Sequence, residues 1–356
     1  MSLIDHNTFS LQLLLNRLKI FFSYLTKRNQ VPSIPIEIMV EVTNYCNIRC
    51  SMCSNPIIKR KKGYMSWDIL KKLVDEIKGK AELIYLYGLG EPLLHPQIIE
   101  MIQYCKNNNL RVGLSINVTL LSEKMSQKLL NSGLDYLIFS LGGFTKETHE
   151  KILVNAKYEL VHKNIMDYIR LKAETKNKLY TIIQLVYLEE NKHEVNEFVK
   201  YWKKFKQLNE VRIKPYVNFD YMPKKIEPNK SQKKPRCFYI WRQAYIYWDG
   251  TVIMCCMDAD NTYPLGNINK DSLYNIWNND KIRTIRTLHN TGNVSKCELC
   301  SVCNLSQFSR IIVFGISLFD SLTVKKVLPK VEKIYFKFFR NKMFDKSFKK
   351  NIMKIR

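Results

Sequence analysis

Two features are missing from the 356-residue sequence and a third is scarce, and each limits the class of protein that it can encode. No signal-peptide succession of charged, apolar and small residues opens it, so its ten cysteines do not indicate a secreted disulfide scaffold. No apolar run reaches the roughly 20 residues that cross a bilayer. Acidic residues are few, 32 against 57 Lys and Arg, and the net charge of +25 requires an anionic partner or surface to explain it.

Cysteines, by contrast, are closely spaced. An alternating apolar run over 36–42, typical of a strand, leads into Cys46, Cys50 and Cys53, which are separated by three and then two residues. Thiolates this close can bind one iron–sulfur cluster. A [4Fe–4S] cluster normally takes four cysteines, so three leave one iron open for another ligand. Zinc is the alternative, but its ligands usually come in pairs from two segments, and the spacing and soft ligands favour the cluster.

This Cys-x-x-x-Cys-x-x-Cys motif, with Tyr45 and Met52 beside its cysteines, resembles the signature of the radical S-adenosylmethionine (SAM) superfamily. The resemblance implies a catalytic [4Fe–4S] cluster whose open iron binds the amino and carboxylate groups of SAM. It also implies an electron from a ferredoxin- or flavodoxin-like donor and cleavage of SAM to a 5′-deoxyadenosyl radical. That radical would remove a hydrogen atom from the substrate.

Short apolar runs and amphipathic helical patterns alternate after the motif, as in an α/β protein with a parallel sheet. The further strands are expected at 83–87, 111–116, 136–140, 181–186 and 211–214. The helices are expected at 66–78, 97–107, 122–131, 158–172 and 194–205. An open sheet and a barrel both fit this pattern. The family resemblance implies the partial (β/α)6 TIM-like barrel, followed by a small C-terminal cysteine-rich auxiliary cluster domain.

Glycine and polar residues follow several expected strands, where the active residues of α/β enzymes lie. Gly88, Gly90 and Glu91 resemble the family's glycine-rich motif. The glycines would let the backbone approach a ligand, and Glu91 would accept from an ammonium group. Asn117 and Ser140 follow the next two strands and also resemble cofactor-binding positions, although a glycine replaces the aspartate that is common two residues after this serine. The resemblance implies that these five residues hold SAM.

A second cysteine group follows a Pro-, Asn- and Lys-rich stretch that predicts a linker. Asp249-Gly250 between two alternating runs predicts a hairpin. The whole group resembles a SPASM or shorter twitch domain, which implies a second Fe–S cluster, expected to be [4Fe–4S]; a zinc knuckle is the alternative. Its candidate ligands are Cys237, Cys255, Cys297, Cys300 and Cys303. Cys256 would be a spare thiol, able to return a hydrogen atom to a product radical.

The predicted organisation is an N-terminal amphipathic helix (1–35), the barrel (36–215), the linker (216–234), the auxiliary domain (235–308) and a basic, aromatic-rich amphipathic tail (309–356). Lysines mixed with phenylalanines in the tail favour an anionic membrane surface over nucleic acid, for which no motif is present. The N-terminal helix would pack on the barrel bottom or lie on lipid. The basic run 59–62 predicts a solvated face or a contact with an anionic substrate. We expect a cytoplasmic protein, peripheral on the inner face of the membrane.

The resemblance leaves the reaction open between oxidation, in which the auxiliary cluster takes an electron, and epimerisation, in which Cys256 returns a hydrogen atom. About 35 residues precede the first strand, which is few for a peptide-binding domain. We therefore expect a small-molecule substrate, a sugar or polyol, or a lipid-linked glycan precursor. Modification of a ribosomal peptide or a protein side chain is the alternative. An Fe–S electron carrier or zinc-stabilised binding protein would cleave no SAM.

Overall fold

A computed structural model describes residues 11–216 and 236–303, so most of the predicted linker and the whole of the predicted tail lie outside the described residues. Nine strands form one sheet in the order β11-β10-β9-β1-β3-β4-β5-β7-β8, and β2 pairs with β6. The strand bounds are β1 Glu37–Val40, β2 Arg49–Cys50, β3 Leu83–Tyr85, β4 Arg111–Ile116, β5 Tyr136–Leu141, β6 Leu153–Val154, β7 Tyr180–Tyr187, β8 Glu210–Pro215, β9 Gln243–Ile246, β10 Thr251–Ile253 and β11 Pro264–Asn267.

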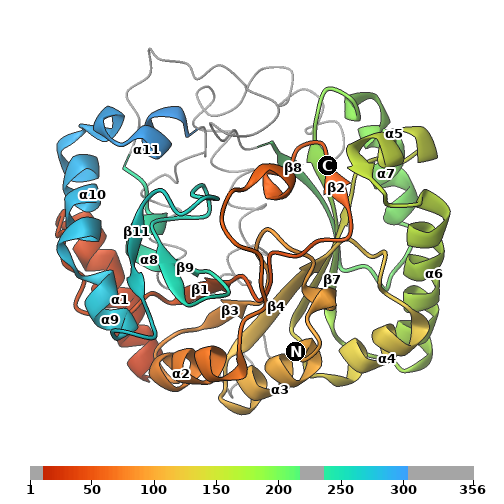
Figure 1. Cartoon of the computed structure of the whole chain (residues 1–356). Coiled ribbons are helices and arrows are strands. Elements are labelled where there is room, and N and C mark those ends of the chain that lie inside the picture. The colour runs from red at the N-terminus through yellow and green to blue at the C-terminus, as the bar shows by residue number, and fades with distance from the viewer. Residues whose placement is uncertain (1–10, 217–235, 304–356) are drawn as a thin grey trace, which may run out of the picture.

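Helices connect these strands and cover one face of the sheet (Figure 1). The α-helices are α1 Leu11–Leu25, α2 Trp67–Ile77, α3 Ile98–Asn107, α4 Glu123–Asn131, α5 Lys146–Ile152, α6 Tyr158–Glu174, α7 Val195–Trp202, α8 Tyr239–Arg242, α9 Leu273–Trp277, α10 Asp280–Thr291 and α11 Glu298–Val302. Short 3-10 helices are η1 Asn55–Ile57, η2 Pro92–Leu94, η3 Lys192–Glu194 and η4 Val294–Lys296.

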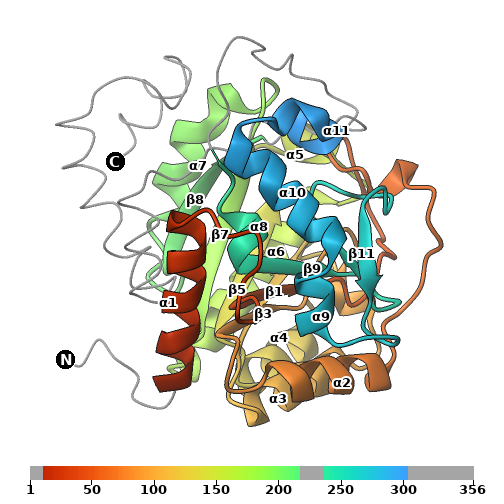
Figure 2. The same cartoon turned by 90° about the vertical axis from the view of Figure 1, so that its left-hand side faces the viewer.

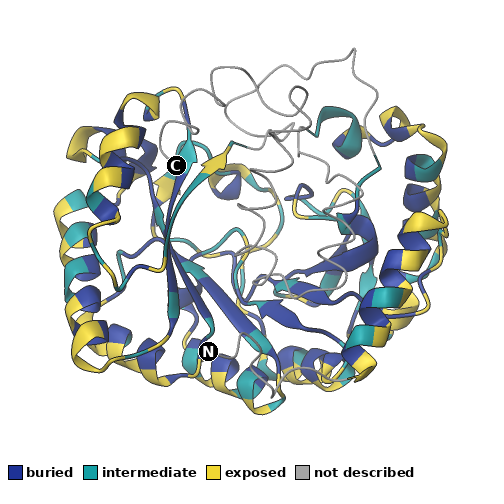
Figure 3. Cartoon of the chain, turned by 180° about the vertical axis from the view of Figure 1, so that it is seen from behind, coloured by how far each residue is buried: buried dark blue, intermediate teal, exposed yellow. Residues whose placement is uncertain are grey.

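The six strands β1, β3, β4, β5, β7 and β8 are all parallel, which confirms the partial barrel. On β5, Leu137, Phe139 and Leu141 belong to the core cluster shared with the helices, while the alternate residues face the other side of the sheet. Seen from behind, the ring is buried inside and exposed on its outer helix faces (Figure 3). The alternation thus supplies a core on one face and leaves the other face for a site.

Serine caps set the starts of two predicted helices. The hydroxyl of Ser66 accepts from the backbone N–H of Ile69, and that of Ser122 accepts from Met125 at 3.2 Å. Such a cap stabilises a helix by about 1 kcal/mol, because it satisfies an N–H group that has no partner within the helix. Both helices therefore begin one residue after the predicted first residue.

The strands of the auxiliary segment extend the barrel sheet. β9 pairs in parallel with β1, with Ile38 opposite Ala244, and β10 returns antiparallel to β9. The hairpin predicted at Asp249-Gly250 is confirmed, with Gly250 in the left-handed region at φ 85°. The division at residues 215 and 235 stays a prediction, but backbone hydrogen bonds join the two parts into one sheet.

Helix α1 docks at the end of the barrel where the parallel strands begin (Figure 2). The guanidinium of Arg17 lies 2.7 Å from the carboxylate of Glu82, which precedes β3, and both side chains are buried. The opposite face exposes large apolar side chains, Leu11, Leu15, Phe22 and Leu25. One face thus packs against the barrel, which was one of the two predicted alternatives, and the other keeps an apolar stripe. Within the described residues, no helix has the length and apolar character needed to cross a membrane.

Candidate active site

The loop that follows β1 carries the three predicted thiols to the carboxyl end of the parallel strands, and all three are half-buried. Cys50 lies on β2, whose pairing with β6 places it opposite Leu153. The backbone N–H of Ser51 donates to Ile152 at 2.8 Å. These contacts attach the cysteine loop to the segment after α5, on the far side of the barrel, so the chain brings Cys46, Cys50 and Cys53 together in one anchored turn.

Burial and mutual repulsion keep these thiols protonated when no cation is nearby. Burial, followed by the charges of Cys53 and Cys46, raises the pKa of Cys50 far above its ordinary value. Burial raises the pKa of Cys53 to about 11. A bound metal centre reverses this preference, because its positive charge stabilises thiolates. In the described parts of the chain, no three His, Cys, Asp or Glu side chains are grouped as ligands of a single metal ion.

Gly88 and Gly90 pack against the cysteine loop, not against an open space. A Cβ added to Gly90 would lie 2.2 Å from the carbonyl oxygen of Thr43, and one at Gly88 would lie 2.7 Å from the Cβ of Glu41. The backbone N–H of Glu91 also donates to the carbonyl of Tyr45 at 2.8 Å. The close approach that an added Cβ would block is therefore between two protein loops. The predicted contact of these glycines with SAM stays a prediction.

The carboxylate of Glu91 joins two loops. It is 2% exposed and accepts hydrogen bonds from the backbone N–H groups of Leu93 at 3.1 Å and Asn117 at 2.7 Å. Burial, only partly opposed by these bonds, raises its pKa to about 7. In this arrangement Glu91 positions the loop after β4. Its predicted contact with the amino group of SAM stays a prediction.

Asn117 lies between the cysteine loop and the loop after β4. Its amide donates to the side-chain oxygen of Asn47 at 2.9 Å and its oxygen accepts from the backbone N–H of Thr119 at 3.0 Å. Its side chain is also a hydrogen-bonding neighbour of the Cys46 thiol, lowering a pKa that burial raises. Asn117 therefore lies beside the first cysteine of the motif, where the predicted cofactor would bind.

Ser140 lies on the inner face of β5, with its hydroxyl 3.2 Å from that of Ser115 on β4. The glycine that replaces the usual aspartate has a structural reason. A Cβ on Gly142 would already lie 2.9 Å from the side chain of Leu153, and one on the next residue, Gly143, would lie 2.7 Å from the side chain of Thr148. The turn into α5 thus excludes side chains at these two positions.

A row of polar side chains across three strands was missed by the sequence reasoning. Ser140 is paired in register with Gln184, and Gln184 with Arg212, so the three lie side by side on one face. Gln184 is 8% exposed, and its side-chain oxygen has no hydrogen-bond partner among the described residues. Arg212 donates to the carboxylate of Glu210 at 2.6 and 2.7 Å. In the sequence, a charged residue stands at every second position of β8, namely Glu210, Arg212 and the exposed Lys214. This alternation could have predicted a polar face on that strand.

Arg60, from the predicted basic run, is not part of a solvated face. Its guanidinium forms a two-pronged pair with Glu41 at 2.7 and 2.5 Å, and both side chains are largely buried. It also donates to the carbonyl of Ala259 at 2.7 Å and stacks 3.8 Å over the ring of Tyr247. Arg60 therefore connects the cysteine loop to the segment that follows β10.

The cysteines of the auxiliary segment gather although they are distant in sequence. Cys237 precedes α8, Cys255 follows β10, and Cys297 and Cys300 flank the start of α11. Burial, followed by the charge of Cys303, raises the pKa of Cys237 to about 12, and the charges of Cys255 and Cys237 both reach Cys300. A hydrogen bond from the Cys300 thiol lowers the pKa of Cys297. The predicted ligands, Cys303 included, thus lie in one neighbourhood.

Cys256 is exposed, unlike its neighbour Cys255. Surrounding protein raises the pKa of its thiol, and a hydrogen bond with Tyr245 and the charge of Lys214 lower it. Lys214 is the last charged residue of the polar row on β8. The auxiliary segment therefore lies next to that row at Cys256. Its predicted role as a hydrogen donor is not tested by this placement.

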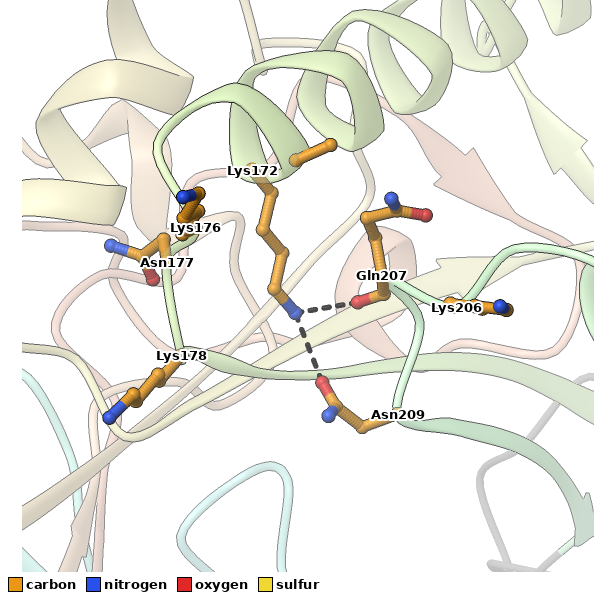
Figure 4. Close-up of a pocket in the computed structure, with 8 residues that line it drawn as sticks. Lys172, Lys176, Asn177, Lys178, Lys206, Gln207 and Asn209 are labelled. Atoms are coloured by element: carbon orange, nitrogen blue, oxygen red, sulfur yellow. Dashed lines mark hydrogen bonds between the residues drawn. The ribbon is translucent and has the colours of Figure 1, made fainter.

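A lysine-rich pocket of about 230 Å³ is lined by residues from the end of α6 and from the segments that precede β7 and β8 (Figure 4). The buried Lys172 ammonium donates to the carbonyl of Gln207 at 2.5 Å and to Thr181 and Asn209 at 3.0 Å each. These bonds use its three hydrogens, and burial lowers its pKa to about 8. Because Thr181 lies near the start of β7, this pocket is remote from the cysteines. It is a structural feature of the barrel bottom.

Comparison with known families agrees with this geometry. Residues 40–201 match the model of the Radical SAM superfamily, and residues 237–304 match SPASM, an iron–sulfur cluster-binding domain. The chain belongs to the radical SAM superfamily. Its cofactors are [4Fe–4S] clusters and SAM. Iron–sulfur clusters, not zinc, are therefore the metal centres of both cysteine groups.

Individual relatives are distant. The tungsten-containing aldehyde ferredoxin oxidoreductase cofactor-modifying protein of Pyrococcus furiosus is 25% identical over 68% of this chain and 80% of its own length. PqqA peptide cyclase of Bradyrhizobium diazoefficiens is 22% identical over 47% of this chain and 43% of its own length.

Solved radical SAM structures share the fold. The complex of BtrN with AdoMet and 2-DOIA has a TM-score of 0.55 at 20% identity, covering 78% of this chain and 96% of that chain. SuiB of Streptococcus suis bound to its precursor peptide SuiA has a TM-score of 0.63 at 15% identity, covering 83% and 76%.

Proposed function

We propose that this radical SAM enzyme removes a hydrogen atom from a side chain of a peptide or protein. The observation that carries the proposal is the three-thiol loop at the mouth of a barrel whose sheet does not close. Among the described strands, β8 and β11 are the two edges of the sheet and are not paired with each other. An extended chain can approach such a mouth from the side, whereas a closed barrel admits it only from the end.

Cys46, Cys50 and Cys53 would hold the catalytic cluster, and Cys237, Cys255, Cys297 and Cys300 the auxiliary one, with Cys303 as a further candidate. When bound, the reduced catalytic cluster supplies the electron that cleaves SAM and generates the 5′-deoxyadenosyl radical. Glu91 and Asn117 position the loops around the cofactor, and Ser140 and Gln184 offer it hydrogen-bonding groups. A ferredoxin- or flavodoxin-like protein would deliver the electron.

Arg212 and Lys214 give the substrate side of the barrel mouth a positive charge, which only Glu210 opposes on that strand. A carboxylate or phosphate on the substrate would be attracted there. Cys256, at the edge of the same row, would return a hydrogen atom if the reaction is an epimerisation. If the auxiliary cluster instead takes an electron, the reaction is an oxidation.

The substrate preference changes in the light of the relatives. PqqA peptide cyclase is named for a peptide substrate, and both SuiB and anSMEcpe have been solved with peptides bound. These relatives favour the peptide or protein alternative over the sugar, polyol or lipid-linked substrate expected above. A small-molecule substrate stays the second candidate, because the chain covers 96% of BtrN, whose complex contains 2-DOIA.

Protease sensitivity separates the two substrate classes. Reconstituted, reduced enzyme would be incubated with SAM and a size-fractionated extract of the host cells, and the formation of 5′-deoxyadenosine measured. We expect a fraction that stimulates formation several-fold and loses this effect after protease digestion. Stimulation that survives digestion would overturn the peptide proposal in favour of a small molecule. The Cys50→Ala variant controls for cofactor breakdown that does not depend on the enzyme.

We further propose that the protein binds anionic membrane surfaces through the exposed stripe of α1, defined by Leu11, Leu15, Phe22 and Leu25. Leu11 is 69% and Phe22 56% exposed, although both are large apolar residues. Lys19, Lys27 and Arg28 are exposed on or just beyond the same helix. Apolar side chains that enter the headgroup region beside cations are typical of interfacial helices.

The double variant Leu15→Gln, Phe22→Gln should lose at least about tenfold in affinity for phosphatidylglycerol vesicles, because burial of each apolar side chain is worth about 1.5–3 kcal/mol. Co-sedimentation of the full chain measures this. Leu160→Gln, which changes an exposed leucine on α6, is the matched control and should bind normally. Equal binding by all three proteins would contradict the role of the stripe.

A further inference from the structure

His289, on α10, lies between two segments that supply auxiliary cysteines. Its side chain is buried, with an exposed fraction of 6%. The ring nitrogen Nδ1 accepts a hydrogen bond from the backbone N–H of Cys237 at 3.3 Å. The other ring nitrogen, Nε2, lies 3.4 Å from the Sγ atom of Cys300. The imidazole of His289 thus contacts both Cys237, the first cysteine of the auxiliary group, and Cys300 on α11.

These two contacts define the tautomer. A nitrogen that accepts from an N–H group carries no proton, so the neutral ring holds its hydrogen on Nε2. Nε2 then donates to the sulfur of Cys300. The hydrogen position follows here from the arrangement of donors and acceptors, in the usual way for histidine.

The helix that carries His289 is held firmly. Arg286, one turn earlier, is fully buried and donates to the carbonyls of Ile240 at 2.9 Å, Asn29 at 3.0 Å and Trp277 at 2.9 Å. Its guanidinium lies 4.7 Å from the ring of Trp277. A donor on such a support keeps its direction when the charge of its acceptor changes.

We infer that His289 raises the reduction potential of the auxiliary cluster through an N–H···S hydrogen bond to Cys300. The inference rests on the proposed ligation of this cluster by Cys300. Reduction adds a negative charge that spreads onto the cluster sulfurs, and hydrogen bonds to those sulfurs are one of the factors that set the potential. A donor stabilises the reduced form more than the oxidised form, because its bond strengthens with the charge of the acceptor. The cluster becomes a better electron acceptor, which suits it to take an electron from a substrate radical.

The test uses full-length protein in which Cys46, Cys50 and Cys53 are replaced by alanine, so that a single cluster remains. The midpoint potential is measured by redox titration with detection by electron paramagnetic resonance. His289→Leu should lower the potential, His289→Gln should restore part of it because an amide N–H can donate, and His162→Leu should leave it unchanged. His289→Leu protein with full iron content and an unaltered potential would overturn the inference.

A second measurement needs no substitution at His289. In protein labelled with ¹⁵N-histidine, pulsed paramagnetic resonance of the reduced auxiliary cluster should show weak coupling to one imidazole nitrogen. Absence of this coupling would reject the hydrogen bond. The measurement therefore tests the inference even if the His289→Leu protein does not retain the cluster. Iron analysis of Cys300→Ala tests the ligand set separately: retention of the auxiliary cluster would show that the ligation is wrong, not the role of the histidine.

Discussion

Replacing Cys50 by alanine should reduce SAM cleavage to background and lower the iron content from about eight to about four per chain, because one of two [4Fe–4S] clusters is lost. Cys50 is the cysteine of the motif that lies on a strand, paired with β6, so its thiol has a defined position. The measurement is iron content together with 5′-deoxyadenosine formation, on protein reconstituted without oxygen and reduced with a strong reductant.

The matched control for this prediction is Cys105→Ala. Cys105 is fully buried on α3 among apolar residues and is remote from both cysteine groups. It should keep both clusters and full cleavage. Undiminished 5′-deoxyadenosine formation by Cys50→Ala would contradict the assignment of the catalytic cluster to this loop.

Arg60→Ala should destabilise the protein by about 3–5 kcal/mol, because it leaves the Glu41 carboxylate buried without its partner. The Glu41 side chain is 4% exposed, and burial already raises its pKa against the opposing effect of Arg60. The same change removes the bond to Ala259, which connects the cysteine loop to the auxiliary segment. We therefore expect weaker retention of the catalytic cluster as well. Urea unfolding and iron content measure the two effects.

Two variants make the Arg60 prediction specific. Lys61→Ala removes the next cation of the same run, which is exposed, and should change the unfolding free energy by less than about 0.5 kcal/mol. Adding Glu41→Gln to Arg60→Ala should recover part of the loss, since no buried charge remains. If Arg60→Ala and Lys61→Ala unfold at the same urea concentration, the ion pair has no role in stability.

Local patterns were sufficient for most of the barrel. The strand predicted at 111–116 has the same bounds as β4, and the helix predicted at 66–78 differs from α2 only by its capping residues. Strand and helix periodicities are properties of a few neighbouring residues, so a sequence displays them directly. The cysteine spacing is equally local, because three ligands within eight residues can meet without help from the rest of the chain.

Side-chain roles were less predictable, and the glycine-rich loop shows why. The pattern Gly-Leu-Gly-Glu indicates a close approach but does not say to what. In the structure the approach is to Thr43 and Glu41, residues more than forty positions earlier. Similarly, the run 59–62 looks uniformly cationic in sequence, and only the folded chain places Arg60 against a buried carboxylate.

The sequence by itself thus determined the family, the two cysteine groups and the order of strands and helices, all of which depend on short-range spacing. The tertiary structure alone decided that β9 continues the barrel sheet beside β1, that Gln184 and Arg212 extend the row begun by Ser140, and that His289 lies between Cys237 and Cys300. These contacts join residues tens to hundreds of positions apart. Their free energy comes from burial and register across the whole sheet, which no local pattern encodes.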